Sequence, residues 1–381
     1  MRPGSFQFVR HLLLVLVAAP LFFSFPQGFA QNALANHLPK RIVGDYGYWS
    51  KSQTPPYSHA QIPYKMLTHI NHAGMSFKED GALVVPDGFL EPELNDEAHA
   101  HGLKVLLLLG GNFTGLESSG AVSVLVDNIA AFEEQYHYDG VDMDWEYPAT
   151  TGDREFFVEL MDKLRKSNPG YTLSIDVAPW GGYGYDLKKL QLSTDYFNIM
   201  MYDCAGPWTA HGQLNSPIFW DHHDPAPYEC QPGGSAQEAA DIFLKAVPPL
   251  QLNMGTPFYG YFYTNINQLF GLCPNAAYTA DGECDNTVRT LNYGTGIKQK
   301  IDRDGWYTTY DSIAYVPYML RTDGDNGYIT YDDAFSTAFR VWYSDWDRGL
   351  GGTFMWSLDA DYDGHSQDLL GAMYTATVTG P

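Results

Sequence analysis

The stretch DGVDMDWEYP, residues 139–148, places four acids within ten positions: Asp139, Asp142, Asp144 and Glu146. In a β-strand successive side chains point to opposite faces, so Asp142, Asp144 and Glu146 share one face, about 6.6 Å apart per step. Neighbouring carboxylates repel each other, which keeps at least one proton bound and separates their pKa values. A carboxyl group that stays protonated near neutral pH can act as a general acid. The stretch therefore predicts a catalytic strand.

The residues between these acids argue against a solvated edge strand. Val141, Met143 and Trp145 are bulky and apolar, so we expect the opposite face of the strand to be buried. Perturbed acids inside a buried strand are typical of functional sites. Asp139 is at an odd position, so its side chain should point to the opposite face from the three other acids. We expect it to have a structural role.

The first thirty residues have the pattern of a secretory signal peptide. Arg2 and Arg10 give the positive start, residues 12–19 form an apolar run, and small residues near Ala30 offer a cleavage site. The run is shorter than the about 20 apolar residues that a membrane span requires. We therefore predict that residues 1–30 are removed and that the protein is secreted, with no membrane attachment after cleavage.

The chain is strongly acidic, with a formal net charge of −23, or −25 without the signal peptide, which holds two Arg and no acids. Nucleic acid and anionic membranes would repel such a surface. We therefore expect a neutral or cationic partner and no nucleic acid.

Four cysteines can form two disulfides in an oxidising compartment, with three possible pairings. Closeness in sequence favours Cys273 with Cys284, and then Cys204 with Cys230. Neither pair has the spacing of a zinc site. Free buried thiols are the alternative.

Short apolar stretches alternate with helical patterns from residue 41 onward, which is typical of a parallel sheet covered by helices. Eight stretches are predicted as strands: 41–49, 68–77, 103–111, 140–147, 171–180, 195–203, 251–260 and 350–359. Helical patterns include 122–137, 154–167, 236–247 and 331–346. Eight βα units in about 350 residues fit an α/β fold of the (β/α)8 TIM barrel type. A doubly wound open sheet is the alternative, but no Gly-rich phosphate loop follows the first strand.

The segment between the seventh and eighth strands is too long for one helix. It is rich in Tyr, Gly, Asn and Asp and contains a strand-like stretch at 304–320. We predict a small α+β insertion at 261–333, and a barrel made of 31–260 and 334–381. Because βα loops of a barrel surround its catalytic face, the insertion should form a wall of the substrate groove.

Several of these stretches together resemble glycoside hydrolase family 18, the chitinases. DGVDMDWEYP matches the DxxDxDxE signature of that family. Further similar stretches are the Gly110–Gly111 pair, MMYDCAGPW at 200–208, GTPFYG at 255–260 and GGTFMWSLDAD at 351–361. The resemblance covers roughly residues 41–375.

The resemblance implies a retaining hydrolysis in which the substrate itself supplies the nucleophile. Glu146 then corresponds to the general acid, which later deprotonates water. Asp144 corresponds to the acid that holds the N-acetyl nitrogen and shares a proton with Asp142 or Glu146. Asp142 corresponds to the buried acid that raises the pKa of its neighbours, and Tyr202 to the tyrosine that hydrogen-bonds the acetamido carbonyl.

The resemblance also implies a set of substrate-binding residues: Met200, Asp203, Trp208, Trp356, Gly110 and Gly111. An indole such as that of Trp356 suits a sugar subsite, because its flat face covers the C–H face of a pyranose. No motif assigns Trp49, Trp180 or Trp220, for which core packing is the alternative.

Three positions depart from the family pattern. The family usually has a Tyr at the position of Asp45 and a Ser at that of Leu108, both of which support the innermost aspartate. Asp45 is then either an extra acid that raises the coupled pKa values, or Tyr46 takes the missing role through a local shift. Asn112 stands where an aromatic platform is common. These departures should affect pH optimum and substrate preference more than reaction type.

The run DHHD at 221–224 has residue types that bind metals, but adjacent residues on a loop rarely converge on one ion. We therefore predict no metal and no cofactor. We expect a monomeric chitinase whose partners are chitin or chitooligosaccharides. An endo-β-N-acetylglucosaminidase acting on N-glycans is one alternative, and a chitin-binding lectin without catalysis is another.

Overall fold

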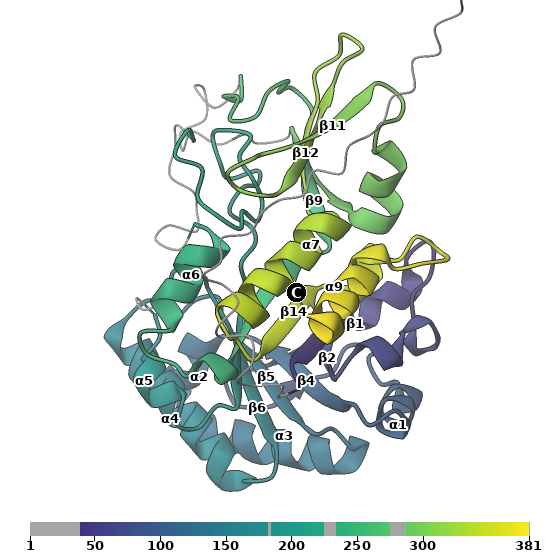
Figure 1. Cartoon of the computed structure of the whole chain (residues 1–381). Coiled ribbons are helices and arrows are strands. Elements are labelled where there is room, and N and C mark those ends of the chain that lie inside the picture. The colour runs from purple at the N-terminus through teal and green to yellow at the C-terminus, as the bar shows by residue number, and fades with distance from the viewer. Residues whose placement is uncertain (1–38, 182–183, 225–233, 275–283, 285–286, 381) are drawn as a thin grey trace, which may run out of the picture. The chain divides into compact units, whose positions relative to one another are not determined.

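The computed structural model describes residues 39–181, 184–224, 234–274, 284 and 287–380, and they belong to one compact unit (Figure 1). The predicted signal peptide and Cys230 lie outside these residues. No helix among the described residues is long and apolar enough to cross a membrane.

Eight parallel strands close into a barrel, in the order β1, β14, β8, β7, β6, β5, β4 and β2. The barrel closes because β1 also pairs with β2, which excludes the open sheet and confirms the predicted fold. The strands are β1 (Arg41–Gly47), β2 (His69–Phe77), β4 (Lys104–Gly110), β5 (Gly140–Asp144), β6 (Thr172–Val177), β7 (Tyr196–Ile199), β8 (Leu252–Pro257) and β14 (Gly352–Trp356). A short β3 (Leu83–Val84) pairs with the end of β2.

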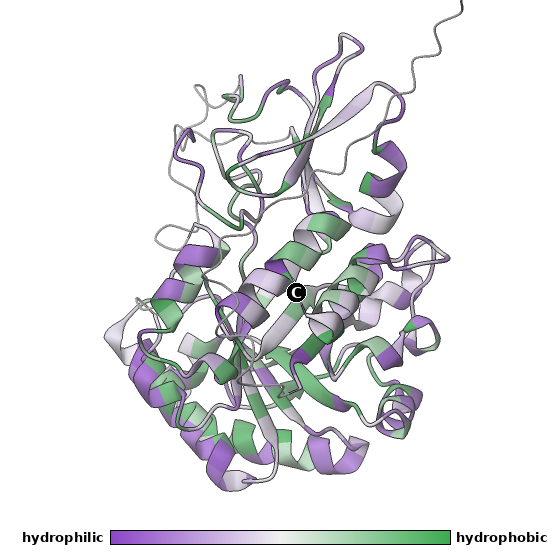
Figure 2. Ribbon diagram, viewed as in Figure 1, coloured by the Kyte–Doolittle hydropathy of each residue, from purple (hydrophilic) through white to green (hydrophobic). Residues whose placement is uncertain are grey.

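Helices follow the strands and lie outside them, and Figure 2 shows hydrophobic residues along the strands and hydrophilic residues on outer helix faces. The longer ones are α1 (Pro92–Ala100), α3 (Val122–Tyr136), α4 (Thr151–Ser167), α6 (Ala236–Phe243), α7 (Ala334–Val341) and α9 (Asp368–Thr379). The shorter ones are α2 (Phe113–Ser119), α5 (Leu187–Leu190) and α8 (Leu358–Asp361). Sequence determines their ends: Thr150 and Asp153 form a capping box at the start of α4.

The insertion forms its own antiparallel sheet, in the order β10, β9, β13, β12 and β11. Its strands are β9 (Tyr259–Tyr263), β10 (Val288–Asn292), β11 (Trp306–Tyr310), β12 (Pro317–Arg321) and β13 (Tyr328–Thr330). The stretch 304–320 is two strands and not one, because Asp311 accepts the backbone N–H groups of Ile313 and Ala314 and so stabilises a turn. The exact domain boundaries at 261 and 333 remain a prediction.

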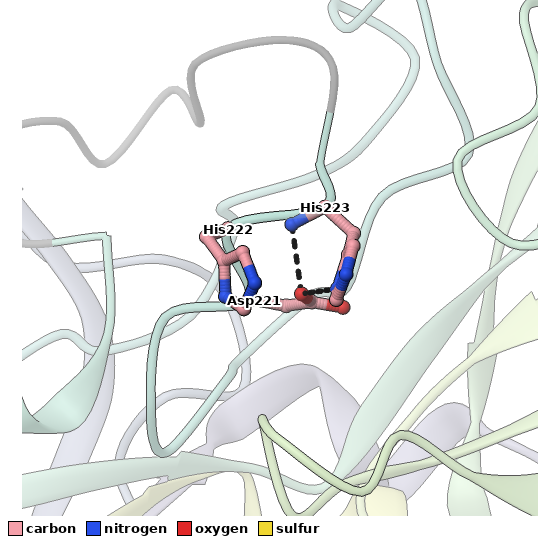
Figure 3. Close-up of side chains that lie close together, drawn as sticks. All are labelled: Asp221, His222 and His223. Carbon is pink, nitrogen blue, oxygen red and sulfur yellow. Dashed lines mark hydrogen bonds and ion pairs between the residues drawn. The ribbon is translucent and has the colours of Figure 1, made fainter.

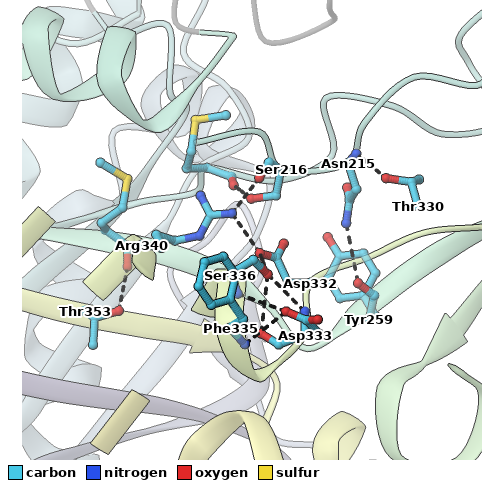
Figure 4. A network of polar contacts seen from close by, with 12 residues as sticks. Asn215, Ser216, Tyr259, Thr330, Asp332, Asp333, Phe335, Ser336, Arg340 and Thr353 are labelled. Atoms are coloured by element: carbon cyan, nitrogen blue, oxygen red, sulfur yellow. Dashed lines mark hydrogen bonds and ion pairs between the residues drawn. The ribbon is translucent and has the colours of Figure 1, made fainter. Parts of the chain in front are cut away.

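A buried polar network connects the loop after β7 to the junction between β13 and α7 (Figure 4). Arg340 is fully buried, and its guanidinium donates to Asp332 at 3.0 Å and to the carbonyl of Ser216. The backbone N–H of Asn215 donates to Thr330 Oγ1 at 2.8 Å. Breaking such a pair would leave a buried charge uncompensated, so the network fixes the end of the insertion sheet against the β7 loop.

The expected disulfide between Cys273 and Cys284 is present, with Cα atoms 5.4 Å apart. Cys204 is also disulfide-bonded, and its predicted partner Cys230 lies outside the described residues. Free thiols are therefore excluded for the three described cysteines.

The start of β5 requires a glycine. Gly140 has φ 155°, and a Cβ there would collide with the backbone of its β6 partner Thr172. We predict that Gly140→Ala lowers the free energy of unfolding by about 2–4 kcal/mol, from backbone strain and overpacking. Urea unfolding followed by circular dichroism measures the change.

Gly371 provides the matched control for this prediction. It lies within α9, and a Cβ there would meet no atom within 4 Å. Gly371→Ala should stabilise the protein by about 0.5–1 kcal/mol, because alanine lowers the conformational entropy of the unfolded chain at this helical position. If both substitutions changed the free energy of unfolding equally, the requirement for a glycine at position 140 would be contradicted.

Candidate active site

The acidic stretch lies at the carboxyl end of β5, inside the barrel. Asp142 is fully buried, and Asp144 is the last residue of the strand. The strand is shorter than the predicted 140–147, so Glu146 lies beyond it and is exposed. The two carboxyls are nevertheless close enough to interact, because the charge of Glu146 raises the pKa of Asp144.

Burial governs the protonation of these acids. It raises the pKa of Asp142 to about 6, against a lowering by polar neighbours such as Asn198, which donates to Asp142 at 3.4 Å. Burial and the charges of Glu146 and Asp142 raise the pKa of Asp144 well above its ordinary value. The pKa of Glu146 is also raised, chiefly because neighbouring protein atoms partly desolvate its carboxyl group even though the residue is exposed. Protons are therefore retained on this stretch into the neutral range.

Asp139 has the structural role that its parity predicts. Its carboxylate accepts the backbone N–H of Val105 at 2.7 Å and lies 2.8 Å from Nε2 of His99. These contacts connect the segment before β5 to β4 and α1. Asp139 therefore holds the strand in place and does not join the three other acids.

Three predicted residues follow β7 and line the same end of the barrel. Met200 and Tyr202 are buried in a cluster that includes Tyr259. Asp203 accepts hydrogen bonds from the hydroxyls of Tyr259 and of Tyr261, the latter at 2.7 Å. Burial raises the pKa of Asp203, and the two hydroxyls lower it. The charge of Asp203 in turn raises the pKa of Glu146, which couples the two groups.

A cavity of about 210 Å³ lies beside Asp203 and receives residues from both the barrel and the insertion. Its lining comprises Asp203, Tyr259, Tyr261, Thr290, Asn292, Trp356, Ser357 and Ala360. The half-buried Trp356 ends β14, and Trp208 packs edge-on against Tyr261 with ring centroids 5.7 Å apart. The insertion strands β9 and β10 thus form one wall of this site.

The ring of Trp49 lies 6.2 Å from that of Trp356, and Trp49 is 37% exposed. Trp180 and Trp220 instead pack against the hydrophobic core. The two rings Trp49 and Trp356 therefore form a continuous aromatic surface at the mouth of the barrel. No sequence motif identified Trp49, because its neighbour in space is 307 positions away in the chain.

The glycine pair lies at the end of β4, next to the acidic strand. Gly110 is the register partner of Asp144, and a Cβ there would lie 3.6 Å from the Asp144 carbonyl oxygen. At Gly111 a Cβ would approach the ring of Phe77 to 2.7 Å. The pair therefore permits close packing beside Asp144.

The departures from the family pattern have definite structural outcomes. Asp45 is fully buried, and Asn71 Nδ2 donates both to Asp45 Oδ1 at 2.9 Å and to Asp142 Oδ2 at 3.1 Å. Tyr46 donates to Glu91 at 2.9 Å and stacks on His72, so it does not take the missing role. The hypothesis of a local shift at Tyr46 is wrong.

The other two departures remove functional groups from the site. Leu108 is the register partner of Asp142 and is buried, but its side chain cannot form a hydrogen bond. Asn112 caps α2, because its Oδ1 accepts the N–H of Gly115 at 2.9 Å, and its Nδ2 donates to Glu79 at 3.0 Å. Asn112 is thus committed to a helix terminus.

Asp176, Asn71 and Asn198 surround Asp142, and no motif in the sequence indicated them. Asp176 is buried and is the register partner of Asp144 across β5 and β6. The alternation of Ser174 and Asp176 in their strand could have indicated that both face the barrel interior. Register between strands, which the sequence does not contain, brings them to the acidic stretch.

The side chains of Asp221, His222 and His223 converge, with one ligand atom of each within 4.8 Å of the others (Figure 3). Asp221 Oδ1 accepts from the backbone N–H of His223 and contacts its Nδ1, both at 2.8 Å. Asp224 instead accepts from Gln213 at 2.9 Å. Local turn hydrogen bonds thus account for the cluster, and the absence of a metal remains a prediction.

Comparisons with known proteins agree with this geometry. Among curated proteins, the chain is 29% identical to a probable endochitinase of Caenorhabditis elegans, covering 68% of this chain and 44% of that protein. It is 27% identical to chitinase A1 of Niallia circulans, covering 71% and 42% respectively. The chain thus spans less than half the length of these two relatives.

Solved structures share the fold. The Group IV chitinase of Ostrinia furnacalis in complex with allosamidin superposes with a TM-score of 0.76 at 22% identity, covering 89% of this chain and 99% of that one. Human YKL-39, described as a pseudo-chitinase with retained chitooligosaccharide binding, gives 0.74 at 21% identity, covering 89% and 100%. The family model described as glycosyl hydrolases family 18 matches residues 41–361, and the chain therefore belongs to that family.

Proposed function

We propose that this protein is a secreted chitinase that hydrolyses β-1,4 linkages between N-acetylglucosamine units with retention of configuration. The observation that carries the proposal is the placement of Asp142, Asp144 and Glu146 at the carboxyl end of β5, where desolvation raises the pKa of each. A general acid must hold its proton at the working pH, and this group can do so. The mouth of the barrel leaves Glu146 accessible to a glycosidic oxygen.

In the proposed reaction Glu146 donates its proton to the glycosidic oxygen as the bond to the anomeric carbon breaks. The acetamido oxygen of the same sugar attacks that carbon and forms an oxazolinium-like intermediate. Asp144 accepts the acetamido N–H with the carboxyl oxygen that carries no proton, and Tyr202 donates to the acetamido oxygen. Water then attacks the anomeric carbon and gives its proton to Glu146, which restores the enzyme. No cofactor or metal takes part.

The proposed substrate is chitin or a chitooligosaccharide, bound along the aromatic surface of Trp49 and Trp356. Flat indole faces suit the C–H faces of pyranose rings. Met200 and Trp208 would line the adjoining positions after β7, and Gly110 and Gly111 would line those beside Asp144. All of these residues belong to one chain, so a monomer can form the complete site.

Secretion is part of the same proposal. The pattern of residues 1–30 supports it, and the disulfide between Cys273 and Cys284 suits an oxidising compartment. Assays of turnover and binding distinguish two other functions from this one. Release of glycans from a glycoprotein would indicate an endo-β-N-acetylglucosaminidase, and binding without turnover would indicate a lectin.

Glu146→Gln tests the assigned general acid. We expect kcat on a defined N-acetylglucosamine hexamer to fall by about 10²–10⁴-fold, because the neutral amide cannot donate the proton. Binding of the hexamer, measured by calorimetry, should persist. Product lengths and anomers from the unmodified protein report the linkage that is cleaved, and turnover by Glu146→Gln close to the unmodified rate would refute the mechanism.

Tyr261→Phe tests the coupling between Asp203 and Glu146. Loss of one donor should raise the pKa of Asp203, so that Asp203 carries less charge and the pKa of Glu146 falls. The basic limb of the pH profile of kcat/KM should therefore move to lower pH, by about half a unit.

Tyr263→Phe is the matched control on the same strand. Its hydroxyl donates to the Gly206 carbonyl at 3.2 Å rather than to Asp203. This substitution should cost about 1 kcal/mol of stability without moving the basic limb. An equal shift in both variants would show that general loosening of β9, and not Asp203, is responsible.

A further inference from the structure

Two buried carboxyls in the barrel take no part in the proposed reaction. Asp45 of β1 is fully buried, and Asp176 of β6 is 3% exposed. Each has one carboxyl oxygen without a hydrogen-bond partner, Oδ2 of Asp45 and Oδ1 of Asp176. An ionised carboxylate in such a place is costly, so both positions favour the protonated form.

Both carboxyls are connected to Asp142, from opposite sides. On one side Asn71 Nδ2 bridges Asp45 Oδ1 and Asp142 Oδ2, at 2.9 and 3.1 Å. On the other side lies Asp176 of the neighbouring strand β6, whose carboxyl lowers the pKa of Asp142 as a hydrogen-bond donor would. Asn198 Nδ2 donates to Asp142 Oδ1 at 3.4 Å. Asp142 therefore receives hydrogen bonds from groups that carry no positive charge.

The charged and titratable groups that face Asp142 come from four strands. They are Asp45 on β1, Asp144 on β5, Asp176 on β6 and Tyr196 on β7. No cation of the described chain contributes to the shift at Asp142.

Arg41 is connected to Asp142 through intermediate side chains: it lies over the ring of Tyr196, 4.7 Å from the centroid, and two amides form a second connection. Its Nε donates to Asn253 Oδ1 at 3.0 Å, and Asn253 Nδ2 donates to Asn198 Oδ1 at 2.8 Å. Asn198 then donates to Asp142. Without a facing cation the cluster of acids can hold few negative charges, so most of its members must keep their protons.

We propose that Asp45 and Asp176 are positioning residues for the proposed reaction, which keep their protons at the working pH and stabilise Asp142 as the carboxylate of the cluster. This inference rests on the proposed function. Burial and the charge of Asp142 raise the pKa of both residues well above the ordinary value, whereas that of Asp142 is about 6. Asp142 accepts hydrogen bonds from the amides of Asn71 and Asn198, whereas Asp45 Oδ2 and Asp176 Oδ1 have no hydrogen-bond partner among the described residues. Asp142 is therefore the carboxyl that ionises first, and Asp144 keeps a proton that it can share with Glu146.

The two residues also account for the departures at 45 and 108. The resembling family supports its innermost aspartate with a Tyr and a Ser, and here those positions are Asp45 and Leu108. Asp176 supplies the donor that Leu108 cannot, and Asp45 positions Asn71. A neutral donor on each side of Asp142 is thus retained with different residues.

Paired substitutions in the full chain test the proposal. Asp176→Leu removes the donor, so Asp142 should take up a proton and Asp144 lose it, and kcat on chitooligosaccharides should fall by about 100-fold with KM little changed. Asp176→Asn is neutral and retains a donor, so it should recover activity to within about tenfold of the unmodified protein. The same order is expected at Asp45: Asp45→Leu should lower kcat strongly, and Asp45→Asn should recover most of it.

Stability provides a readout that needs no activity. A group whose pKa is raised by folding favours the folded state below its unfolded pKa, and this contribution is lost as the pH rises towards the folded value. The melting temperature of the unmodified protein should therefore fall from pH 5 to pH 8. Asp45→Asn and Asp176→Asn should each reduce that fall, because an amide does not titrate.

Glu133→Gln is the matched control. Glu133 is buried in α3, and burial together with the Asp139 charge raises its pKa to about 8. This substitution should reduce the fall in melting temperature in the same way, but leave the pH profile of activity unchanged, since Glu133 lies outside the barrel interior.

Two results would overturn the proposal. In the first, the Asn variants are as inactive as the Leu variants while still folded, which would mean that the ionised form is required. In the second, the Asn variants leave the pH dependence of melting unchanged. If the unmodified protein hydrolyses no chitooligosaccharide, the proposed function fails, and the melting experiment still tests the protonation of Asp45 and Asp176.

Discussion

The desolvation of carboxyl groups inside the barrel is the constraint on which the site depends. Asp45, Asp142, Asp144 and Asp176 project from β1, β5 and β6 into a space from which water is largely excluded. Ionising more than one of them would place like charges close together in a medium of low dielectric constant. Most of these carboxyls therefore stay protonated. The register between the strands determines which carboxyls are neighbours and can share a proton.

The same constraint shapes the outer part of the site. Asp203 is buried and is stabilised by the hydroxyls of Tyr259 and Tyr261, both from the insertion sheet. Because β9 begins two residues after β8 ends, the sheet that carries these hydroxyls is fixed to the barrel strand itself. The insertion thus contributes to the electrostatics of the site as well as to its wall.

The sequence predicted the barrel because its signals are local. The alternation of apolar and polar residues and the helix-capping residues give strand and helix positions to within a few residues. The spacing of the acids in 139–148 shows which of them share a face of the strand. The surroundings of Asp142 could not be predicted in this way. Asn71, Asp176 and Asn198 reach it through register across several strands, and Tyr46 turns outward because Glu91, 45 positions later, accepts its hydroxyl. The motif shows that Asp45 departs from the family pattern. It does not show whether Asp45 is an extra acid or whether Tyr46 takes the missing role through a local shift.

Neutral donors around Asp142 serve the proposed chemistry better than a cation would. A Lys or Arg facing Asp142 would stabilise its charge strongly and would also lower the pKa of Asp144 and Glu146. At neutral pH Glu146 would then lose the proton that it must donate, and Asp144 would lose the proton that it keeps. Amides such as Asn71 and Asn198 instead orient the carboxylate with only partial charges. The positive charge that develops on the sugar can then be stabilised by Asp142 and its neighbours alone, without competition from a resident cation.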